Sequence, residues 1–413
     1  MPEIINRDIK INLSKKKIVT IAGVRRSGKT SLMFQCIKDL LNKGIKKENI
    51  IYIDFENERL INTHAEDLDN LLIANIELFR SEGDIYLFLD EIQNINYWDK
   101  WVRKIYNMEK YYIIITGSSS KLLSSEIATS LAGRNITYMV YPFSFNEFIN
   151  AKHISIDTTK KYSIEKGIIL KELNEFLNYG SFPEMAFINN ENTKIEILSS
   201  YFDAIFYKDI IRRYNVREIN DLNIFLKIMA SNYGLYFSSV KLYRYFLNMN
   251  SKISRTTIIN FLYYSISVFM VYKLEQYKNI TTKRISGNIK TYIIDTGISI
   301  LFSDIDRGRS LENAVFMHLI RNKKPYEKIY FMKLKSGKEI DFLILGKNKE
   351  ILQVSYDVSN PETKNREVSA IIEASKSLNL NYGTIITYNY TNEEIINGIK
   401  IIYKSFWEWS LEL

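Results

Sequence analysis

One stretch of the chain, IVTIAGVRRSGKTSLMFQCIKDLL at 18–41, limits the fold more than any other. Residues 18–22 are an apolar run rich in β-branched side chains, which predicts a buried strand, and residues 31–41 carry apolar residues at helical spacing. Between them, GVRRSGKT at 23–30 matches G-x-x-x-x-G-K-[ST] at every fixed position. This motif between a strand and a helix predicts a phosphate-binding loop.

The residue types of this loop suit nucleotide phosphates. Gly23 and Gly28 allow the backbone to curl so that consecutive N–H groups point at phosphate oxygens, and the helix N-terminus adds partial positive charge. Lys29 can reach the β- and γ-phosphates, and the Thr30 hydroxyl can ligate Mg²⁺. The residues predicted to bind the nucleotide are Gly23, Val24, Arg25, Arg26, Ser27, Gly28, Lys29, Thr30 and Ser31.

The stretch DIYLFLDEIQN at 84–94 supplies the acidic groups that a nucleotide hydrolase needs. Its apolar residues at 85–89 predict a strand that ends at Asp90 and Glu91. A carboxylate at the tip of a neighbouring strand can hold Mg²⁺, which is the role we assign to Asp90. A second carboxylate beside it can orient and deprotonate the attacking water, which is the role we assign to Glu91.

Two further polar residues are candidates for contacts with the phosphates. Ser118 follows a predicted strand at 111–116, where its hydroxyl could touch the γ-phosphate or the attacking water. An ordinary serine turn is the alternative. Arg134, in LAGRN, is a candidate cation for the phosphates, either of its own chain or of a neighbouring subunit. A surface arginine without a catalytic role is the alternative there.

Strand and helix candidates alternate through residues 1–150, the first predicted domain. The expected strands lie near 18–22, 50–55, 85–89, 111–116 and 136–140. This alternation predicts an α/β fold with a parallel sheet and helices on both faces. Ligands bind at the carboxyl ends of such strands, where Gly28, Asp90 and Ser118 all fall.

Several stretches together resemble one family. They are GVRRSGKTSL at 23–32, YIDFENERL at 52–60, LFLDEIQNINYWDKWVRKIY at 87–106, ITGSSSKLL at 115–123, SLAGRNITYMVYPFSFNEF at 130–148, YGSFPEMAF at 179–187, YIIDTGI at 292–298, LENAVF at 311–316 and KEIDFLI at 338–344. They are similar to the prokaryotic, largely archaeal, AAA+-type P-loop ATPases with a conserved C-terminal region of unknown function. The resemblance implies an ATP-binding domain, a winged-helix segment and a C-terminal domain similar to PD-(D/E)xK nucleases. It implies no particular cellular role.

The middle of the chain, predicted as a helical and winged-helix domain at 151–290, carries the excess positive charge. Residues 223–290 hold ten Lys and Arg residues against one acidic residue, Glu275. Helices at 240–247 and 255–269, the second capped by Ser254, and a basic hairpin at 271–294 suit a winged helix that binds DNA. The candidate contacts are Lys252, Arg255, Thr256, Thr257, Lys283 and Arg284. A winged helix that contacts only protein is the alternative.

The third predicted domain, 291–413, resembles PD-(D/E)xK nucleases, in which a helix glutamate, an aspartate and an E-x-K triple bind a divalent metal and activate water. Glu312 and Asp341 match this pattern. Gln353 stands where the second acid belongs, and Ser355 stands where the lysine belongs. We therefore expect a degenerate nuclease-like domain without cleavage activity.

Length, cysteine content and the absence of targeting signals limit which class of protein the chain can belong to. A chain of 413 residues allows about two to four domains. Its one cysteine, Cys36, indicates a reducing compartment. No signal peptide is visible, and the most apolar long stretch, 258–272, is too short to span a membrane and predicts a buried helix. We expect a cytoplasmic protein.

Taken together, the sequence predicts a Mg²⁺-dependent ATPase in which ATP binding and hydrolysis switch a basic winged-helix domain on DNA. An alternative from a different class is a nucleotide switch that organises protein partners, with slow hydrolysis and no specific role on DNA. A third hypothesis is an ATP-regulated nuclease.

Overall fold

The computed structural model describes residues 5–80, 82–118, 131, 133–154, 164–278 and 288–411. The chain divides into two compact units, one spanning 1–142 with 267–269 and the other spanning 143–266 with 270–413. Within the described ranges, no helix is both long and apolar enough to cross a membrane.

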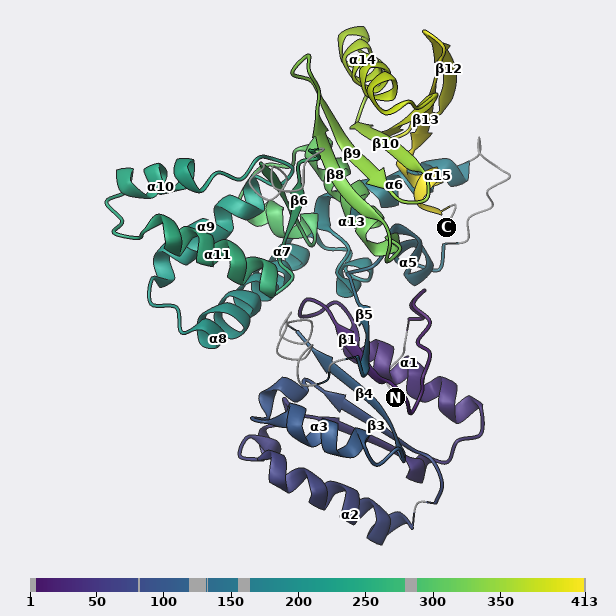
Figure 1. The fold of residues 1–413 in the computed structure, drawn as a ribbon, viewed down its shortest axis with the longest axis vertical. Coiled ribbons are helices and arrows are strands. Elements are labelled where there is room, and N and C mark those ends of the chain that lie inside the picture. Colours follow the sequence, from purple (N-terminus) through teal and green to yellow (C-terminus); the bar gives the residue numbers. More distant parts are fainter. Residues whose placement is uncertain are drawn as a thin grey trace. The chain divides into compact units, whose positions relative to one another are not determined.

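The first unit is built on a five-stranded sheet with the order β2-β3-β4-β1-β5 (Figure 1). Every neighbouring pair of strands runs parallel. The strands are β1 (Ile18–Ala22), β2 (Ile50–Asp54), β3 (Ile85–Asp90), β4 (Tyr111–Gly117) and β5 (Asn135–Met139). The predicted parallel α/β fold is confirmed, and each predicted strand lies within one residue of the observed bounds.

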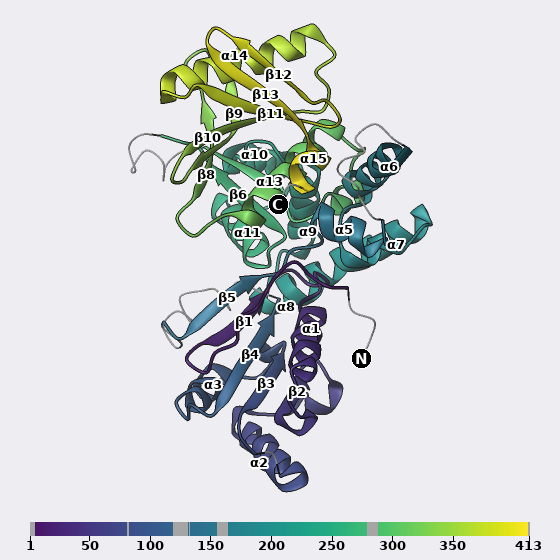
Figure 2. The same ribbon diagram turned by 90° about the vertical axis from the view of Figure 1, so that its right-hand side faces the viewer.

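Helices cover both faces of this sheet (Figure 2). Apolar residues of α1 (Lys29–Asn42) pack with Val19, Phe88 and Ile114 on one face. Residues of α2 (Leu68–Phe79) and α3 (Trp98–Tyr106) pack with Leu87 and Leu89 on the other face. Side chains of β3 therefore alternate between the two layers, as the period of a strand requires. Short 3₁₀ helices between these elements are η1 (Lys47–Asn49), η2 (Glu58–Leu60), η3 (Ala65–Asp67) and η4 (Ile92–Asn94).

The second unit begins with a group of helices. They are α5 (Phe145–Ala151), α6 (Ile164–Tyr179), the 3₁₀ helix η6 (Pro183–Ala186), α7 (Glu191–Ala204), the π-helix η7 (Ile205–Ile211), α8 (Arg212–Tyr214), α9 (Ile219–Ser231), α10 (Ser239–Asn248) and α11 (Arg255–Ser267). The predicted cap is present, because Ser254 Oγ accepts the Thr257 N–H at 3.0 Å. The helix predicted over 258–272 is too long. It ends at Ser267, since Phe269 turns the backbone with a φ of 60°, and a strand follows.

That strand, β6 (Val271–Glu275), pairs antiparallel with β7 (Ile289–Ile293). An isolated antiparallel bridge pairs Tyr236 with Lys290 of β7. We call the chain around Tyr236 the bridged segment. The order along the chain is therefore helix α9, a bridged segment, helices α10 and α11, and a two-stranded hairpin. After the 3₁₀ helix η8 (Thr296–Leu301), helix α13 (Arg307–Asn322) leads into the last sheet.

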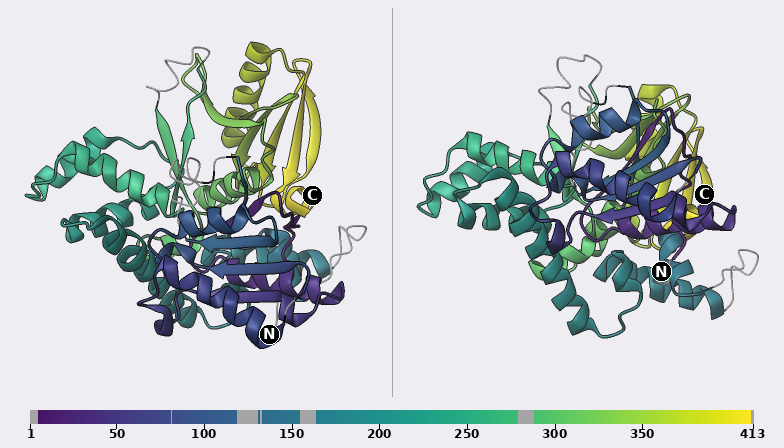
Figure 3. Two further views of the ribbon diagram at one scale, coloured as in Figure 1. Left: turned by 60° about the horizontal axis from the view of Figure 1, so that its bottom comes forward. Right: turned by 90° about the horizontal axis from the view of Figure 1, so that it is seen from below.

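The C-terminal part holds a mixed six-stranded sheet with the order β12-β13-β11-β10-β9-β8. Its strands are β8 (Lys328–Lys333), β9 (Glu339–Leu345), β10 (Lys349–Ser355), β11 (Tyr382–Thr387), β12 (Asn392–Ile396) and β13 (Ile399–Ser405). Helix α14 (Pro361–Leu378) packs on one face through Val368, Ile371 and Ala374, beside the yellow strands in Figure 3. Helix α15 (Phe406–Leu411) ends the described chain.

Two of the motifs quoted above meet in the interior of this unit. The buried Asp295 carboxylate accepts the Ser181 N–H at 2.6 Å, the Ser181 hydroxyl at 2.9 Å and the Gly297 N–H at 2.9 Å. A Cβ on Gly180 would lie 1.6 Å from Asp295 Oδ1, so this position excludes any side chain. These contacts explain why the YGSFP and YIIDTGI stretches contain a glycine and a serine opposite an aspartate.

Candidate nucleotide site and carboxylate cluster

The phosphate-binding loop lies between β1 and α1, as predicted. Gly28 directly precedes α1 with a φ of 96°, a conformation that favours glycine, and Arg26 also has a positive φ of 67°. At the other end of the loop, a Cβ on Gly23 would lie 2.1 Å from the Val140 carbonyl oxygen. Both glycines of the motif are therefore required by the local geometry.

Lys29 and Glu91 face each other at the carboxyl edge of the sheet. The Lys29 Nζ lies 3.4 Å from Glu91 Oε1 and donates to the Val24 carbonyl at 3.2 Å, and both side chains are buried. Burial opposes ionisation of Glu91, but the Lys29 ammonium and the Gln93 amide outweigh burial and hold the pKa of that carboxyl below its usual value. Glu91 is therefore a carboxylate at neutral pH, which a general base requires.

Asp90 accepts hydrogen bonds from three hydroxyl groups. Thr30 Oγ1 lies 2.7 Å and the Tyr52 hydroxyl 3.0 Å from Asp90 Oδ2, and Thr116 Oγ1 donates to Asp90 Oδ1. Thr116 Oγ1 also accepts the Glu91 N–H at 2.9 Å, so one buried hydroxyl orients both acidic residues. Burial and the Asp90 carboxylate raise the pKa of Tyr52 and keep it a donor.

Sequence reasoning missed Tyr52 and Thr116. Thr116 lies near the carboxyl end of β4, and Tyr52 lies in the middle of β2; both strands neighbour β3 in the order β2-β3-β4. The available signal was a polar residue within an apolar strand, which becomes informative once the strand order is known.

The donor set at this edge fits Mg²⁺. A threonine hydroxyl and a carboxylate within hydrogen-bonding distance of each other are hard oxygen ligands, and Mg²⁺ is usually held by one or two such groups with phosphates and water. Within the described residues, the buried Ser27 Oγ in the loop has no hydrogen-bond partner. A buried polar atom of this kind suits a site that binds a polar ligand.

The two remaining candidates of this unit lie at opposite edges of the sheet. Ser118 is buried directly after β4, whose Gly117 pairs with Ala22, so it lies near the phosphate-binding loop. Arg134 lies at the amino edge, because its carbonyl accepts the Ile18 N–H at 2.8 Å. The five residues of β1 separate it from the loop by about 16 Å. A contact of Arg134 with the phosphates, of its own chain or of a neighbouring subunit, stays a prediction.

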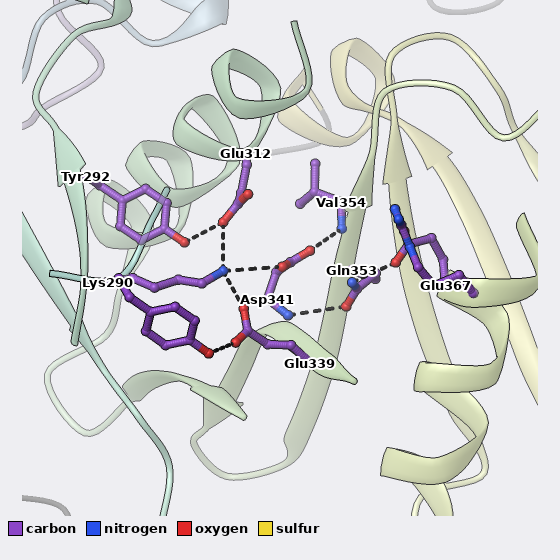
Figure 4. A network of polar contacts seen from close by, with 10 residues as sticks. Lys290, Tyr292, Glu312, Glu339, Asp341, Gln353, Val354 and Glu367 are labelled. Atoms are coloured by element: carbon purple, nitrogen blue, oxygen red, sulfur yellow. Dashed lines mark hydrogen bonds and ion pairs between the residues drawn. The ribbon is translucent and has the colours of Figure 1, made fainter. Parts of the chain in front are cut away.

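A second polar cluster lies in the second unit, around the ammonium group of Lys290 (Figure 4). Lys290 Nζ lies 2.5 Å from Glu339 Oε1, 3.3 Å from Glu312 Oε1 and 3.6 Å from Asp341 Oδ1. The Tyr292 hydroxyl donates to Glu312 at 2.6 Å, and the Tyr236 hydroxyl donates to Glu339. We name these three acidic residues and Lys290 the Lys290 cluster. It joins β7 and the bridged segment to α13 and β9.

The structure brings Glu312 and Asp341 together, as the nuclease pattern predicts, and places Gln353 beside them. Gln353 Oε1 accepts the Asp341 N–H at 3.2 Å, and its amide donates to Glu367 at 2.7 Å. The Ser355 hydroxyl donates to the Asp357 carbonyl at 3.1 Å. Neither residue supplies the charge that the nuclease pattern needs, while Lys290, from a distant part of the sequence, supplies a cation.

Burial and the neighbouring charges together shift the pKa values of this cluster. Burial and the neighbouring Glu312 raise the pKa of Asp341 well above its usual value. Burial works against the charged form of Lys290, but the three carboxylates outweigh burial and raise its pKa. Across the described part of the chain, no group of three or more His, Cys, Asp or Glu side chains is arranged to hold a metal ion.

The candidate DNA contacts lie on and before α11. Lys252, Arg255 and Thr256 are exposed, while Thr257 is half-buried in the Ser254 cap. The Arg255 Nε donates to Ser239 Oγ at 2.9 Å, which joins α11 to α10. Lys283 and Arg284 lie outside the described residues.

The sheet, the phosphate-binding loop and the adjoining carboxylates define a nucleotide-binding P-loop protein of the AAA+ class. A family model described as an AAA domain matches residues 15–149. Residues 170–308 and 307–407 match two domains of unknown function, DUF8612 and DUF4143. The winged-helix and nuclease-like interpretations therefore stay predictions.

Two uncharacterized proteins are similar to nearly the whole chain. One, from Methanocaldococcus jannaschii, is 42% identical over 421 residues, which cover 99% of this chain and 91% of that protein. The other, from Haemophilus influenzae, is 33% identical over 395 residues, which cover 94% of each. The chain belongs to the family of these archaeal and bacterial proteins.

Solved structures are more distant. The Walker-type ATPase PABY2304 of Pyrococcus abyssi is 17% identical with a TM-score of 0.42, over 69% of this chain and 90% of that chain. The Aeropyrum pernix ORC1 protein, in complex with DNA, is 12% identical with a TM-score of 0.32, over 72% of this chain and 86% of that chain.

Proposed function

We propose that the protein hydrolyses ATP with Mg²⁺ and that the nucleotide state controls a DNA-binding middle domain. The observation that carries the hydrolysis is the convergence of Lys29, Thr30, Asp90 and Glu91 at one sheet edge. Mg²⁺, when bound with nucleotide, would neutralise phosphate charge beside Thr30 and Asp90.

The pairing of Lys29 with Glu91 suggests how binding prepares the site. Lys29 Nζ lies 3.4 Å from the Glu91 carboxylate, and γ-phosphate oxygens would compete for the same ammonium. When Lys29 turns to the phosphates, Glu91 loses the neighbouring ammonium and becomes available to accept a proton from water. Thr116 keeps the Glu91 backbone in place during this exchange through the 2.9 Å hydrogen bond. Ser118, buried near the loop, is the proposed contact to the γ-phosphate.

Three observations support DNA binding by the middle of the second unit. The order of α9, a bridged segment, α10, α11 and the β6–β7 hairpin is compatible with the predicted winged helix. The exposed side of α11 carries Arg255, Thr256, Asn260 and Tyr263, residue types that contact base edges and phosphates. The ten basic residues at 223–290 supply the charge, although Lys290 is neutralised within its cluster.

A salt titration of duplex binding tests this proposal. We expect an affinity that falls steeply with salt, because neutralised phosphates release counterions. Lys252→Ala should lower the slope of log K against log salt by about one and weaken all sequences alike, whereas Arg255→Ala should change which sequence is preferred. Lys349→Ala, an exposed lysine on β10, is the matched control and should change neither.

Undetectable duplex binding at ~50 mM salt, where non-specific binding is strong, would contradict the DNA proposal. That result would favour the alternative, a domain that contacts protein. Helix α10 exposes the apolar side chains of Val240 and Leu247, which suit a protein partner better than phosphate.

We further propose that the C-terminal sheet is a degenerate nuclease-like domain that no longer cuts DNA. With Mg²⁺ or Mn²⁺, the protein should leave linear and supercoiled DNA uncut above background in a gel assay. The support is the neutral Gln353 and the ammonium of Lys290 among the carboxylates. Cleavage that disappears in Asp341→Ala, and not in the control Lys349→Ala, would favour the third hypothesis, an ATP-regulated nuclease.

A further inference from the structure

Arg7 is buried against the back of the phosphate-binding loop. Its side chain lies in the first unit with only 5% of its surface exposed. One guanidinium nitrogen, Nη1, donates to the Ser27 carbonyl at 2.7 Å, and the other, Nη2, donates to the Tyr141 carbonyl at 2.7 Å. The backbone of Arg7 is held on α1, because its N–H donates to Gln35 Oε1 at 2.9 Å.

The contact with Ser27 fixes the direction of the next peptide N–H. A trans peptide is planar, so the C=O of Ser27 and the N–H of Gly28 point in opposite directions. A donor that holds the Ser27 carbonyl from one side therefore directs the Gly28 N–H to the other. In a loop of this kind that N–H faces the phosphates. Gly28, with a φ of 96°, is the residue with the greatest freedom to rotate away.

We propose that Arg7 is a positioning residue of the nucleotide site, which holds the Ser27–Gly28 peptide in its phosphate-binding orientation. This inference rests on the proposed binding of ATP phosphates to the loop. Through its contact with Tyr141, the guanidinium also joins the loop to the segment that follows β5. A backbone hydrogen bond links the same segment to the end of β1, because the Val140 N–H donates to the Ala22 carbonyl at 2.7 Å.

Arginine suits this geometry better than lysine. Its planar fork presents two N–H donors to two separate carbonyl oxygens at once, whereas a lysine ammonium on a single stem does not reproduce both directions. Each carbonyl is a strong acceptor, so losing the charged donor costs a hydrogen bond to both of them.

Nucleotide titrations of four proteins test the proposal. Arg7→Met should weaken both Mg²⁺-free ADP and Mg²⁺-ATP by ~10–100-fold in calorimetry, the loss expected for a hydrogen bond to a charged group. Arg7→Lys should lie between Arg7→Met and wild type. Tyr138→Phe is the matched control, because it removes a peripheral contact of the same N-terminal segment, the 3.3 Å bond from the Asn12 N–H, and should bind like wild type.

A second readout separates positioning from general stability. If Arg7 only stabilises the fold, Arg7→Met should melt earlier without nucleotide yet gain the same ADP-induced shift in Tm as wild type, and the proposal is then wrong. If it positions the loop, the shift itself should shrink. Should Arg7→Met fail to fold, Arg7→Lys decides: wild-type affinity in that variant overturns the proposal.

Failure of the underlying function gives a different pattern. In that case wild type binds neither nucleotide, or Lys29→Ala binds as tightly as wild type.

Discussion

Lys29→Ala should abolish tight ATP binding, whereas Glu91→Gln should keep binding and lower turnover at least ~100-fold, the contribution typical of a general base. The ammonium of Lys29 is the charged donor placed to reach the β- and γ-phosphates. Glu91 lies outside the phosphate-binding loop, and the Lys29 ammonium 3.4 Å away favours its ionised form. Calorimetry and a steady-state phosphate-release assay separate the two effects.

Two exposed residues of the same unit provide matched controls. Lys38→Ala removes a lysine from the outer side of α1, and Glu58→Gln removes a surface carboxylate, and both should retain binding and turnover. Equal turnover in Glu91→Gln and wild type would remove Glu91 from the mechanism. Binding by Lys29→Ala at wild-type affinity would remove the loop from the site.

Local patterns carried most of what could be predicted. The alternation of apolar runs and helical spacing located the five parallel strands, and the loop motif located Lys29 and Thr30, because both signals are contiguous in the chain. Asp90 and Glu91 could be assigned because a strand end places them at the edge where ligands bind.

The rest of the site depends on which strands become neighbours. Thr116 acts on Asp90 and Glu91 because β4 lies beside β3, and Arg7 contacts Ser27 although twenty residues separate them. The sequence around Arg134 did not show on which edge of the sheet it lies, because that depends on the pairing of β5 with β1. Such relations arise from long-range packing, which periodicity does not encode.

Counting charged residues along the sequence is misleading at Lys290 for the same reason. It belongs to the basic stretch at 223–290 and would count toward a DNA surface, yet three carboxylates surround it. Those carboxylates come from α13 and β9, at least twenty residues further along the chain. Its positive charge therefore links the β6–β7 hairpin to the C-terminal sheet.

Lys290→Met should destabilise the second unit by ~3–5 kcal/mol, the cost typical of removing one partner of a buried ion pair. Methionine keeps the volume of the side chain but leaves Glu312, Glu339 and Asp341 facing one another without a cation. Urea denaturation of the full chain, followed by circular dichroism, measures the change. Lys273→Met is the matched control on the same hairpin, since its pair with Glu275 is half-exposed and should contribute less than about 1 kcal/mol.

The loss in Lys290→Met should depend on pH and on divalent cations. Burial already raises the pKa of Asp341, so the folded state binds its proton more tightly than the unfolded state, and this contribution is present at low pH and lost as pH rises. Without the ammonium that pKa should rise further, so the stability lost in Lys290→Met should be smaller at pH 5 than at pH 8.

Millimolar Mg²⁺ or Mn²⁺ should also restore stability to the variant and not to wild type, because the freed carboxylates then accept a cation in place of Lys290. Wild-type stability in Lys290→Met at pH 8 would show that solvent, rather than Lys290, balances these charges.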